Sequence, residues 1–320
     1  MMIYYPFELH THTLHSDGNM SPECLVEKAL ERGLKGIAVT DHNTTSAADE
    51  VYKLGLEKGL VVIKGIEWTT FYGHFTVLGG NSNIDWRKIT PDNINEMISI
   101  AAASEDIVNI AHPKRTGSPI CTGCYMEYSV DYSLITGYEV WSNDRPYFNP
   151  TNLNAMAEYK ELLSKGYKLT CLYGDDWHGK NDNRKQYAIT YLGINGEVNA
   201  HSAMEALRKH RTYISTGLKV NIVINNEKGS FMIGDSIGRG AIAIKAILDA
   251  GSDYCVKYGV RPSSITLKGS ALTTVSYPVE GNDININNLK VNPGYFTIEI
   301  QGIIEDKEAV LLITSPVFVV

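Results

Sequence analysis

Histidines are concentrated near the start of the chain. The segment LHTHTLHSDG places His10 and His12 two positions apart and follows them with Asp17. Because side chains at positions i and i+2 of a strand point to the same face, the two imidazoles would project together from a strand end. Parallel imidazoles form half of a metal site. The same spacing returns in GDDWH, which contains Asp176 and His178.

Further residues that can bind metals follow other apolar segments. TDH contains His42, GIEW contains Glu67, and the segments YGH and IAHP contain His74 and His112. Nitrogen and carboxylate ligands without thiolate suit zinc, iron or manganese. The candidate ligands are too many for one ion and would serve two or three, with a carboxylate such as Glu67 bridging. They are His10, His12, Asp17, His42, Glu67, His74, His112, Asp176 and His178.

Two more carboxylates, those of Asp41 and Glu139, could lie near the candidate ligands. Asp41 precedes His42, and we expect it to orient a ligand rather than to bind an ion. Glu139 in YEVW belongs to an apolar strand and could approach the same site.

The elements that must position these residues alternate between strands and helices over the first two-thirds of the chain. Segments 34–42 and 60–70 are expected to form buried strands, with helices between the strands. Short connections of this kind predict parallel strands with right-handed crossovers. The number of strands favours a (β/α) barrel, in which the loops at the carboxyl ends of the strands gather the chemistry on one rim.

The sequence changes character after about residue 211. From 212 to 320 it consists of alternating apolar and polar runs such as KVNIVINN and YFTIEIQG, separated by Gly, Asn, Asp and Pro. This pattern predicts an antiparallel, sandwich-like β domain. We therefore predict an α/β barrel domain over 1–211 and a small all-β domain over 212–320.

Composition narrows the class of protein. The chain of 320 residues is 43% hydrophobic and 20% charged, with a net charge of −7. It contains no apolar run of roughly 18 residues or more, so we expect no membrane span. The first residues lack a basic and then apolar leader pattern, which favours a cytoplasmic location. The acidic balance argues against a broad nucleic-acid surface but allows a small anionic substrate. The sequence does not indicate an oligomeric state.

The segments HTHTLHSDG, GIAVTDHN, GIEWTT, IAHPKR and GDDWH, in this order, resemble the polymerase and histidinol phosphatase (PHP) superfamily of metal-dependent phosphoesterases. The resemblance implies a distorted barrel of seven βα units, a TIM-like (β/α)7 fold, with two or three divalent ions. It implies three ligand sets, which are His10, His12, Glu67 and Asp176 for one ion, Asp17, His42 and His178 for a second, and Glu67, His74 and His112 for a third. Asp176, His178 and Glu67 are the expected catalytic residues.

The expected reaction is attack on a phosphoric ester by a hydroxide that bridges the metal ions. Its substrate would be a small phosphorylated metabolite. Candidate cations for binding the phosphate are Lys114 and Arg115, which follow AHP, and Arg184 in GKNDNRK. His15, in the loop after His12, could also touch the substrate.

Three alternatives remain open at this point. The segment TTFYGHFTVLG and the β-rich tail resemble the carbaryl-hydrolase-like branch of the superfamily, which would extend the substrates to carbamates and other non-phosphate esters. A non-catalytic, metal-containing module that acts through its β domain is an alternative of another class. A nuclease domain like those attached to polymerases is disfavoured by the acidic balance.

Overall fold

The computed structural model describes residues 2–82, 84–117, 123–179 and 188–320. Seven strands form the sheet that carries the site, and they lie side by side in chain order. They are β1 (Ile3–Glu8), β2 (Gly36–Val39), β3 (Val61–Thr70), β4 (Gly73–Leu78), β5 (Ile107–Ile110), β6 (Gly137–Ser142) and β7 (Thr170–Gly174). The helices between them are α1 (Pro22–Glu31), α2 (Ala48–Lys58), α3 (Ile94–Ala103) and α4 (Pro150–Ser164), with short 3-10 turns η1 (Trp86–Lys88), η2 (Tyr132–Leu134) and η3 (Pro146–Phe148).

At the end of the sheet where the site lies, the segments that follow the first and the last of these seven strands are hydrogen-bonded to each other. The backbone of Thr11, beyond β1, forms a parallel bridge with Trp177, beyond β7. The His12 amide donates to the Trp177 carbonyl at 2.9 Å, and the Trp177 amide donates to the His10 carbonyl at 3.0 Å. The first and last strand ends of the row are therefore held together.

Local sequence explains the first elements. Ser21 caps α1 by accepting a hydrogen bond from the Cys24 amide, and Pro22 occupies the first turn, where its missing N–H costs nothing. Gly59 ends α2 in a left-handed conformation, with φ of 75°. The four residues of β2 are all buried, as expected for a parallel strand covered on both faces.

The regular alternation of strands and helices expected from the sequence is interrupted at β4. Only Phe71 and Tyr72 separate β3 from β4, and β4 is antiparallel to both β3 and β5. The tight turn leaves no room for a helix, and Gly73 takes a φ of 149° that side chains rarely adopt. The fold is therefore a mixed α/β sheet, and at this point it departs from a uniform series of seven βα units.

Two strands connect this sheet to the rest of the chain. β8 (Ile189–Ile194) pairs antiparallel with β1, α5 (Ala200–Arg208) follows it, and β9 (Thr212–Ser215) pairs with β8. β9 also pairs with β18 (Lys307–Thr314). The hydrogen-bonded sheet thus continues across the boundary predicted between residues 211 and 212, which stays a prediction.

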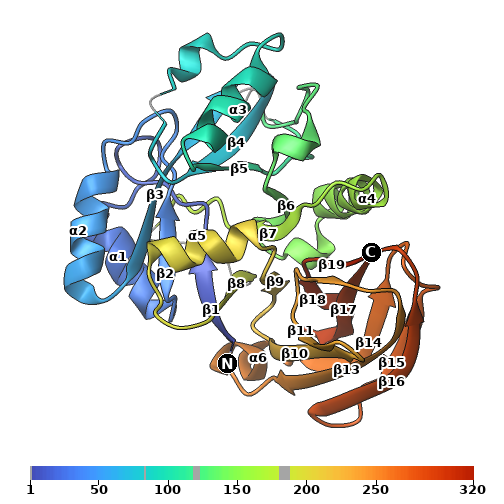
Figure 1. Ribbon diagram of the computed structural model, residues 1–320. Helices are drawn as coiled ribbons and strands as arrows, with labels where there is room; N and C mark the ends of the chain where they lie inside the picture. Colours follow the sequence, from blue (N-terminus) through green and yellow to red (C-terminus); the bar gives the residue numbers. More distant parts are fainter. Residues whose placement is uncertain (1, 83, 118–122, 180–187) are drawn as a thin grey trace.

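The C-terminal part is rich in strands, as its alternating pattern indicates (Figure 1). One sheet has four strands in the order β11-β10-β13-β16, and β17 pairs with β14, β18 and β19. The remaining bounds are β10 (Lys219–Asn226), β11 (Gly229–Phe231), β12 (Ser236–Ile237), β13 (Gly240–Asp249), α6 (Asp253–Tyr258), β14 (Arg261–Lys268), β15 (Val275–Pro278), β16 (Asp283–Val291), β17 (Gly294–Ile304) and β19 (Val317–Val319).

Polar contacts join the two parts of the molecule. The fully buried Glu299 of β17 pairs with Lys160 of α4 at 2.6 Å and with Lys268 of β14 at 2.7 Å. Because a buried carboxylate is costly unless it is paired, these contacts fix β17 against α4. Among the helices in the described ranges, none combines the length and apolarity that crossing a membrane requires.

Candidate metal centre

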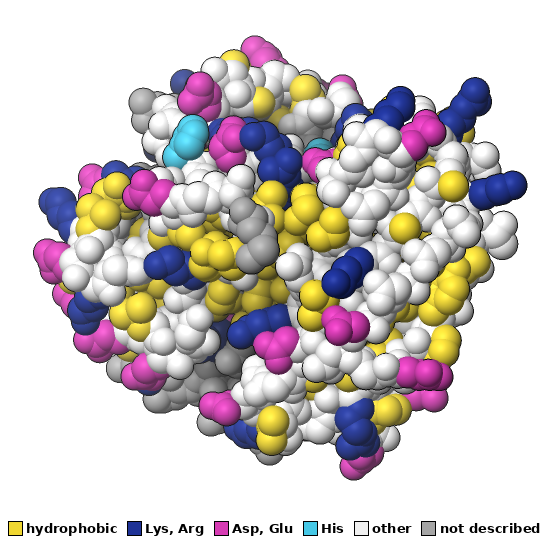
Figure 2. Space-filling view, turned by 60° about the horizontal axis from the view of Figure 1, so that its bottom comes forward, with side chains coloured by type: hydrophobic (Ala, Val, Ile, Leu, Met, Phe, Trp, Pro, Cys, Tyr) yellow, Lys and Arg dark blue, Asp and Glu magenta, His cyan; other side chains and the backbone are white. Residues whose placement is uncertain are grey.

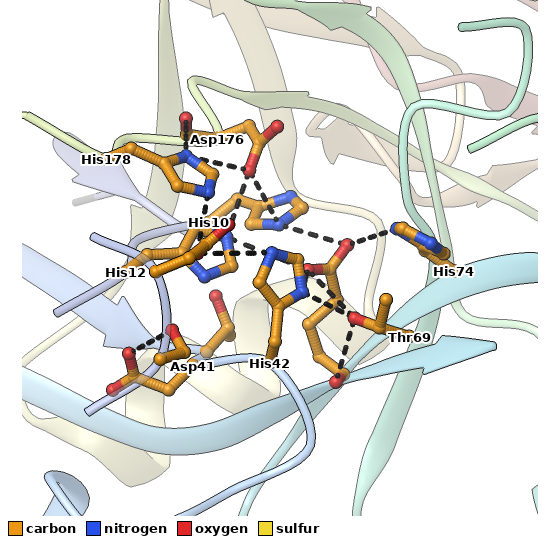
Figure 3. Close-up of polar contacts among 12 residues, drawn as sticks. His10, His12, Asp41, His42, Thr69, His74, Asp176 and His178 are labelled. Atoms are coloured by element: carbon orange, nitrogen blue, oxygen red, sulfur yellow. Dashed lines mark hydrogen bonds and ion pairs between the residues drawn. The ribbon is translucent and has the colours of Figure 1, made fainter. Parts of the chain in front are cut away.

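The nine candidate ligands come from six places in the fold and meet at one end of the sheet. Figure 3 labels six of them, His10, His12, His42, His74, Asp176 and His178. His10, His12 and Asp17 follow β1, and His42 follows β2. Glu67 lies on β3 and His74 on β4. His112 follows β5, and the Asp176–His178 segment follows β7. The hairpin explains how His74 reaches the site, because antiparallel pairing sets it opposite Thr69, two residues from Glu67.

Glu67 lies at the centre of the cluster and is fully buried. Its two carboxylate oxygens approach ring nitrogens of five histidines. Oε1 lies 3.1 Å from His74 Nδ1, 3.2 Å from His112 Nε2 and 3.4 Å from His10 Nε2, while Oε2 lies 2.6 Å from His42 Nδ1 and 3.7 Å from His12 Nε2. A single carboxylate surrounded in this way has the arrangement of a bridging ligand.

Asp176 supplies the second buried carboxylate. Its Oδ1 lies 2.9 Å from His12 Nε2 and 3.4 Å from both His10 Nε2 and His178 Nδ1. The residue has a φ of 50°, a left-handed conformation that costs energy outside glycine and is typical of functional sites. Its other oxygen, Oδ2, pairs with the guanidinium of Arg115.

Asp17 stands on the exposed side of the cluster. Its Oδ1 lies 3.0 Å from His178 Nε2 and 3.4 Å from His42 Nε2. The ring of His12 stacks against the rings of both His42 and His178, at centroid distances of 4.3 and 4.1 Å.

Potential ligand atoms gather into three groups, each with its atoms within 4.8 Å of one another. The groups are His12, Asp17, His42 and His178; His10, His12 and Glu67; and Glu67, His74 and His112. The third group equals a ligand set that the resemblance implies. The other two differ from the implied sets, because His12 also joins the group of Asp17 and Asp176 belongs to none of the three groups.

Unpartnered ring nitrogens test whether a metal fits. Within the described ranges, buried nitrogens without a hydrogen-bond partner include Nε2 of His10, Nδ1 of His12, Nε2 of His74 and Nδ1 of His112. Buried polar atoms are nearly always satisfied, and leaving one unpaired costs about 1–3 kcal/mol. Several such nitrogens facing two carboxylates fit divalent cations as the missing partners.

Electrostatics in the metal-free chain are dominated by burial and by these close contacts. Burial alone raises the pKa of Glu67, but the adjacent His10, His112 and His42 overcome it and hold that pKa well below its usual range. Burial likewise raises the pKa of Asp176, and Arg115 and the histidines outweigh it and lower the pKa. Both carboxylates are therefore ionised and able to bind cations.

The histidines differ according to their carboxylate partners. Burial lowers the pKa of His12 and of His112, and their acidic neighbours only partly offset it. Burial also acts to lower the pKa of His42, but Asp17 and Glu67 outweigh it and raise the pKa to about 10. A metal ion bound by His42 would have to displace that proton.

Carboxylates beneath the ligands fix the backbone that carries them. Asp41 accepts hydrogen bonds from the Thr13 amide at 2.7 Å and from the Ser16 hydroxyl at 2.7 Å, and so holds the loop that leads to Asp17. Glu8 accepts from the amides of His10 and Asp175 at 3.0 and 2.9 Å. Asp41 thus orients a ligand loop, as expected from its position beside His42.

Gly18 lies where the loop after β1 passes very close to the backbone of His12. A Cβ at this position would lie 2.5 Å from the His12 carbonyl oxygen, so the loop can return against His12 only with glycine here.

The predicted substrate-binding residues have different surroundings. Arg115 reaches the cluster through Asp176. Lys114 pairs with Glu158 Oε2 at 3.0 Å and with the Tyr125 hydroxyl at 3.3 Å. His15 is exposed, and its Nδ1 lies 2.8 Å from the Ser46 hydroxyl. Arg184 lies outside the described residues.

Sequence reasoning missed several residues that hold the ligands. Glu8 and Thr69 are two of them, and Thr69 Oγ1 lies 2.5 Å from His42 Nδ1, while the Asp175 amide donates to Glu8. Glu8 precedes His10 by two positions and therefore shares its strand face, which was the available signal. Asp175 and Thr69 show no comparable pattern.

Two relatives with named activities resemble short parts of the chain. The 5'-3' exoribonuclease Rnm of Escherichia coli K12 is 37% identical over 83 residues, which are 25% of this chain and 28% of that protein. The phosphoribosyl 1,2-cyclic phosphate 1,2-diphosphodiesterase of Eggerthella lenta is 36% identical over 64 residues, or 20% of this chain and 24% of that protein. The chain thus spans only about a quarter of the length of these relatives.

The structural comparison covers nearly the whole chain. A two-domain protein from Bacteroides vulgatus, described as containing a predicted PHP-like metal-dependent phosphoesterase, superposes with a TM-score of 0.56 at 17% identity. The match covers 98% of this chain and 95% of that one, so the two share a fold. These matches do not test the resemblance to the carbaryl-hydrolase-like branch. The family model of the PHP domain matches residues 8–211, so the chain belongs to the PHP domain family.

Proposed function

We propose that this protein is a metal-dependent hydrolase that cleaves phosphoric esters of small molecules. The observation that carries the proposal is the convergence of three ligand groups around Glu67, with buried ring nitrogens that have no partner among the described residues. Two or three divalent ions, of zinc, iron or manganese, would lower the pKa of bound water and neutralise charge on the substrate oxygens.

The residues of the chain divide the work between them. The ligands proposed for the ions are the nine residues of the cluster, and Glu67, Asp176 and His178 are the proposed catalytic members. Glu67 and Asp176 supply fixed negative charge within the enclosed part of the site. His178 is held by Asp17 through Nε2 and by the Asp176 carbonyl through Nδ1. It completes the group of His12, Asp17, His42 and His178, called the open group here because a substrate can enter beside it.

Arg115 is the best candidate for binding the phosphoryl group. Its Nη1 pairs with Asp176, whereas its Nη2 is buried and has no hydrogen-bond partner within the described ranges. A guanidinium presents its donors in a planar fork that matches phosphate oxygens. Nη2 would donate to a substrate oxygen placed beside the metal centre.

Relatives with known activities support phosphoric esters as the substrate class. Those named above cleave RNA ends and a cyclic phosphate, and a 3',5'-nucleoside bisphosphate phosphatase of Chromobacterium violaceum is 30% identical over 70 residues. Over the face seen in Figure 2, Lys and Arg side chains are interspersed with Asp and Glu. This mixture and the net charge of −7 favour a small substrate over a long nucleic acid.

A substrate panel tests the proposal. The protein is freed of metal, reloaded with zinc, iron or manganese, and assayed on an aryl phosphate monoester, an aryl phosphate diester, short RNA and an aryl carbamate. We expect cleavage of a phosphoric ester that a chelator abolishes and added metal restores. The monoester and diester arms distinguish a phosphatase from a phosphodiesterase, and cleavage of the carbamate alone would favour the carbaryl-hydrolase-like alternative.

Two results would contradict the proposal. One is full activity in the metal-free protein. The other is a loaded protein that cleaves no phosphoric ester, which would favour a binding module that acts through the β domain.

A further inference from the structure

We propose that Glu139 is a positioning residue that holds histidines of two different ligand groups, so that loss of its carboxylate weakens metal binding in both groups. Glu139 lies on β6 and is buried. Its Oε1 lies 2.8 Å from His10 Nδ1, and its Oε2 accepts a hydrogen bond from the His112 amide at 2.7 Å. The inference rests on the metal centre of the proposed function and not on the reaction catalysed there.

The first contact sets which nitrogen of His10 is free. A neutral imidazole that donates from Nδ1 to the Glu139 carboxylate keeps its lone pair on Nε2. This tautomer would leave Nε2 free to bind an ion. This is the atom that lies 3.4 Å from Glu67 Oε1 and 3.4 Å from Asp176 Oδ1 and has no hydrogen-bond partner among the described residues. A carboxylate behind a histidine commonly fixes the ring of a metal ligand in this way.

The second contact fixes the backbone of His112. This residue has a φ of 27°, which is unfavourable for a side chain with a Cβ and must be held by its surroundings. The hydrogen bond from its amide to Glu139 provides such a restraint, and it leaves His112 Nε2 3.2 Å from Glu67 Oε1. His10 and His112 are thus clamped between Glu139 on one side and Glu67 on the other.

Gly174 on β7 provides an independent sign that the position of this carboxylate is specified. A Cβ at residue 174 would lie 2.1 Å from Glu139 Oε1, so any larger residue there must displace the carboxylate. Gly174 does not have a positive φ, so alanine is acceptable to its backbone. A Gly174→Ala variant therefore keeps the charge of Glu139 but moves it.

The test compares Glu139→Gln with Asp41→Asn. A glutamine side chain has an acceptor oxygen at only one of the two carboxylate positions, so it cannot accept from both the His10 ring and the His112 amide. If it accepts from the amide, its NH2 group donates to His10 Nδ1 and favours the tautomer that protonates Nε2. Asp41 instead holds the loop that leads to Asp17 in the open group. Each protein is loaded with zinc, dialysed against a graded chelator, and crystallised so that anomalous scattering gives the occupancy of each metal position, with circular dichroism as the check of folding.

We expect Glu139→Gln to weaken zinc binding about 10- to 100-fold at the positions that His10 and His112 line, and much less at the position that Asp17 lines. Asp41→Asn should show the opposite selectivity. Unchanged zinc occupancy in folded Glu139→Gln, or equal loss from all positions, would overturn the proposal. Where Glu139→Gln does not fold, Gly174→Ala is judged by the same criteria.

A measurement on the unmodified protein needs no variant. Neutron diffraction from the zinc-loaded protein should show a deuteron on His10 Nδ1 and none on Nε2, whereas a deuteron on Nε2 would overturn the proposal. Because neither readout uses a substrate, metal retention that fails to depend on Glu139 contradicts this proposal alone. A protein that binds zinc but cleaves no phosphoric ester contradicts the proposed function alone.

Discussion

The metal centre has an enclosed half and an open half, and they are built differently. The enclosed half consists of His10, His12, Glu67, His74 and His112, whose exposures are between 0% and 3%. In the open half the side chains of Asp17, His178 and His42 are 59%, 33% and 23% exposed. The enclosed residues lie on or next to strands, whereas Asp17 lies in a loop.

This difference indicates different roles for the two halves. Ligands that are buried and held by Glu8 and Glu139 lose little freedom when an ion binds, so the enclosed half should retain its ions tightly. The open half is accessible to water and to a substrate. We therefore expect its ion to exchange faster and to lie where the substrate binds.

The largest expected effect is that of Glu67→Gln, which should disable metal binding in both the enclosed and the open half. Glu67 approaches histidines of all three groups, so its loss should remove ions from each and lower activity by at least about 100-fold. Metal content and turnover measure the effect, with the exposed Glu57→Gln as the matched control. Full metal content in Glu67→Gln would show that Glu67 does not bridge the halves.

The next effect separates the halves from each other. Asp17→Asn should release the ion of the open half only, so the number of ions per chain falls by one and activity falls about 10- to 100-fold. Metal analysis after dialysis checks the number, and the exposed Asp92→Asn serves as the control. Loss of every ion from folded Asp17→Asn would mean that the two halves bind metal as one unit.

A smaller effect concerns the substrate side of the open half. Arg115→Met removes the buried Nη2 donor and should raise KM about tenfold or more, since a hydrogen bond to a charged group contributes about 1.5–3 kcal/mol. Lys114→Met is the matched comparison. Because Lys114 already pairs with Glu158, it should change KM by less than about threefold. Equal effects of the two substitutions would remove Arg115 from the proposed site.

The smallest expected effect lies outside the centre, at His210. This histidine is half-buried, without a carboxylate partner in the contacts described, and its partial burial and the nearby Lys168 lower its pKa to about 4. The unfolded chain, with a histidine pKa of about 6.5, therefore binds more protons, so stability is complete above pH 6.5 and falls as the pH drops towards 4.

Urea unfolding of the wild-type protein and of His210→Asn between about pH 4 and pH 7 measures the contribution of His210 to the pH dependence of stability. Asparagine suits the left-handed backbone at this position, where φ is 54°. The difference in the free energy of unfolding should change by about 1–3 kcal/mol over this range. The exposed His201→Asn should follow the wild type. A difference that is independent of pH would show that His210 is not buried in its neutral form.

Much of the site was predictable because it follows local rules. The spacing in HTH and DDWH places pairs of ligands on one strand face. The structure gathers eight of the nine predicted residues into three groups, and the ninth, Asp176, lies 2.9 Å from His12 Nε2. The helix around residues 22–31 was predictable from Ser21 and Pro22, which act within one turn.

The parts that could not be predicted depend on contacts between distant residues. Nothing near Glu139 indicates that its oxygens reach the His10 ring and the His112 amide, which lie 129 and 27 positions away. The pairing of Lys114 with Glu158 depends on the packing of α4 against β6. The β3–β4 hairpin was missed because an apolar strand reads the same in parallel and antiparallel sheets.

Anomalous scattering from crystals of the protein loaded with zinc, iron or manganese would show directly whether the clustered residues bind metal ions. We expect two or three peaks per chain, one within bonding distance of His10 and Glu67 in the enclosed half and one within bonding distance of Asp17 and His178 in the open half. A map with no peak among these residues, after loading with each metal, would contradict the proposed metal centre.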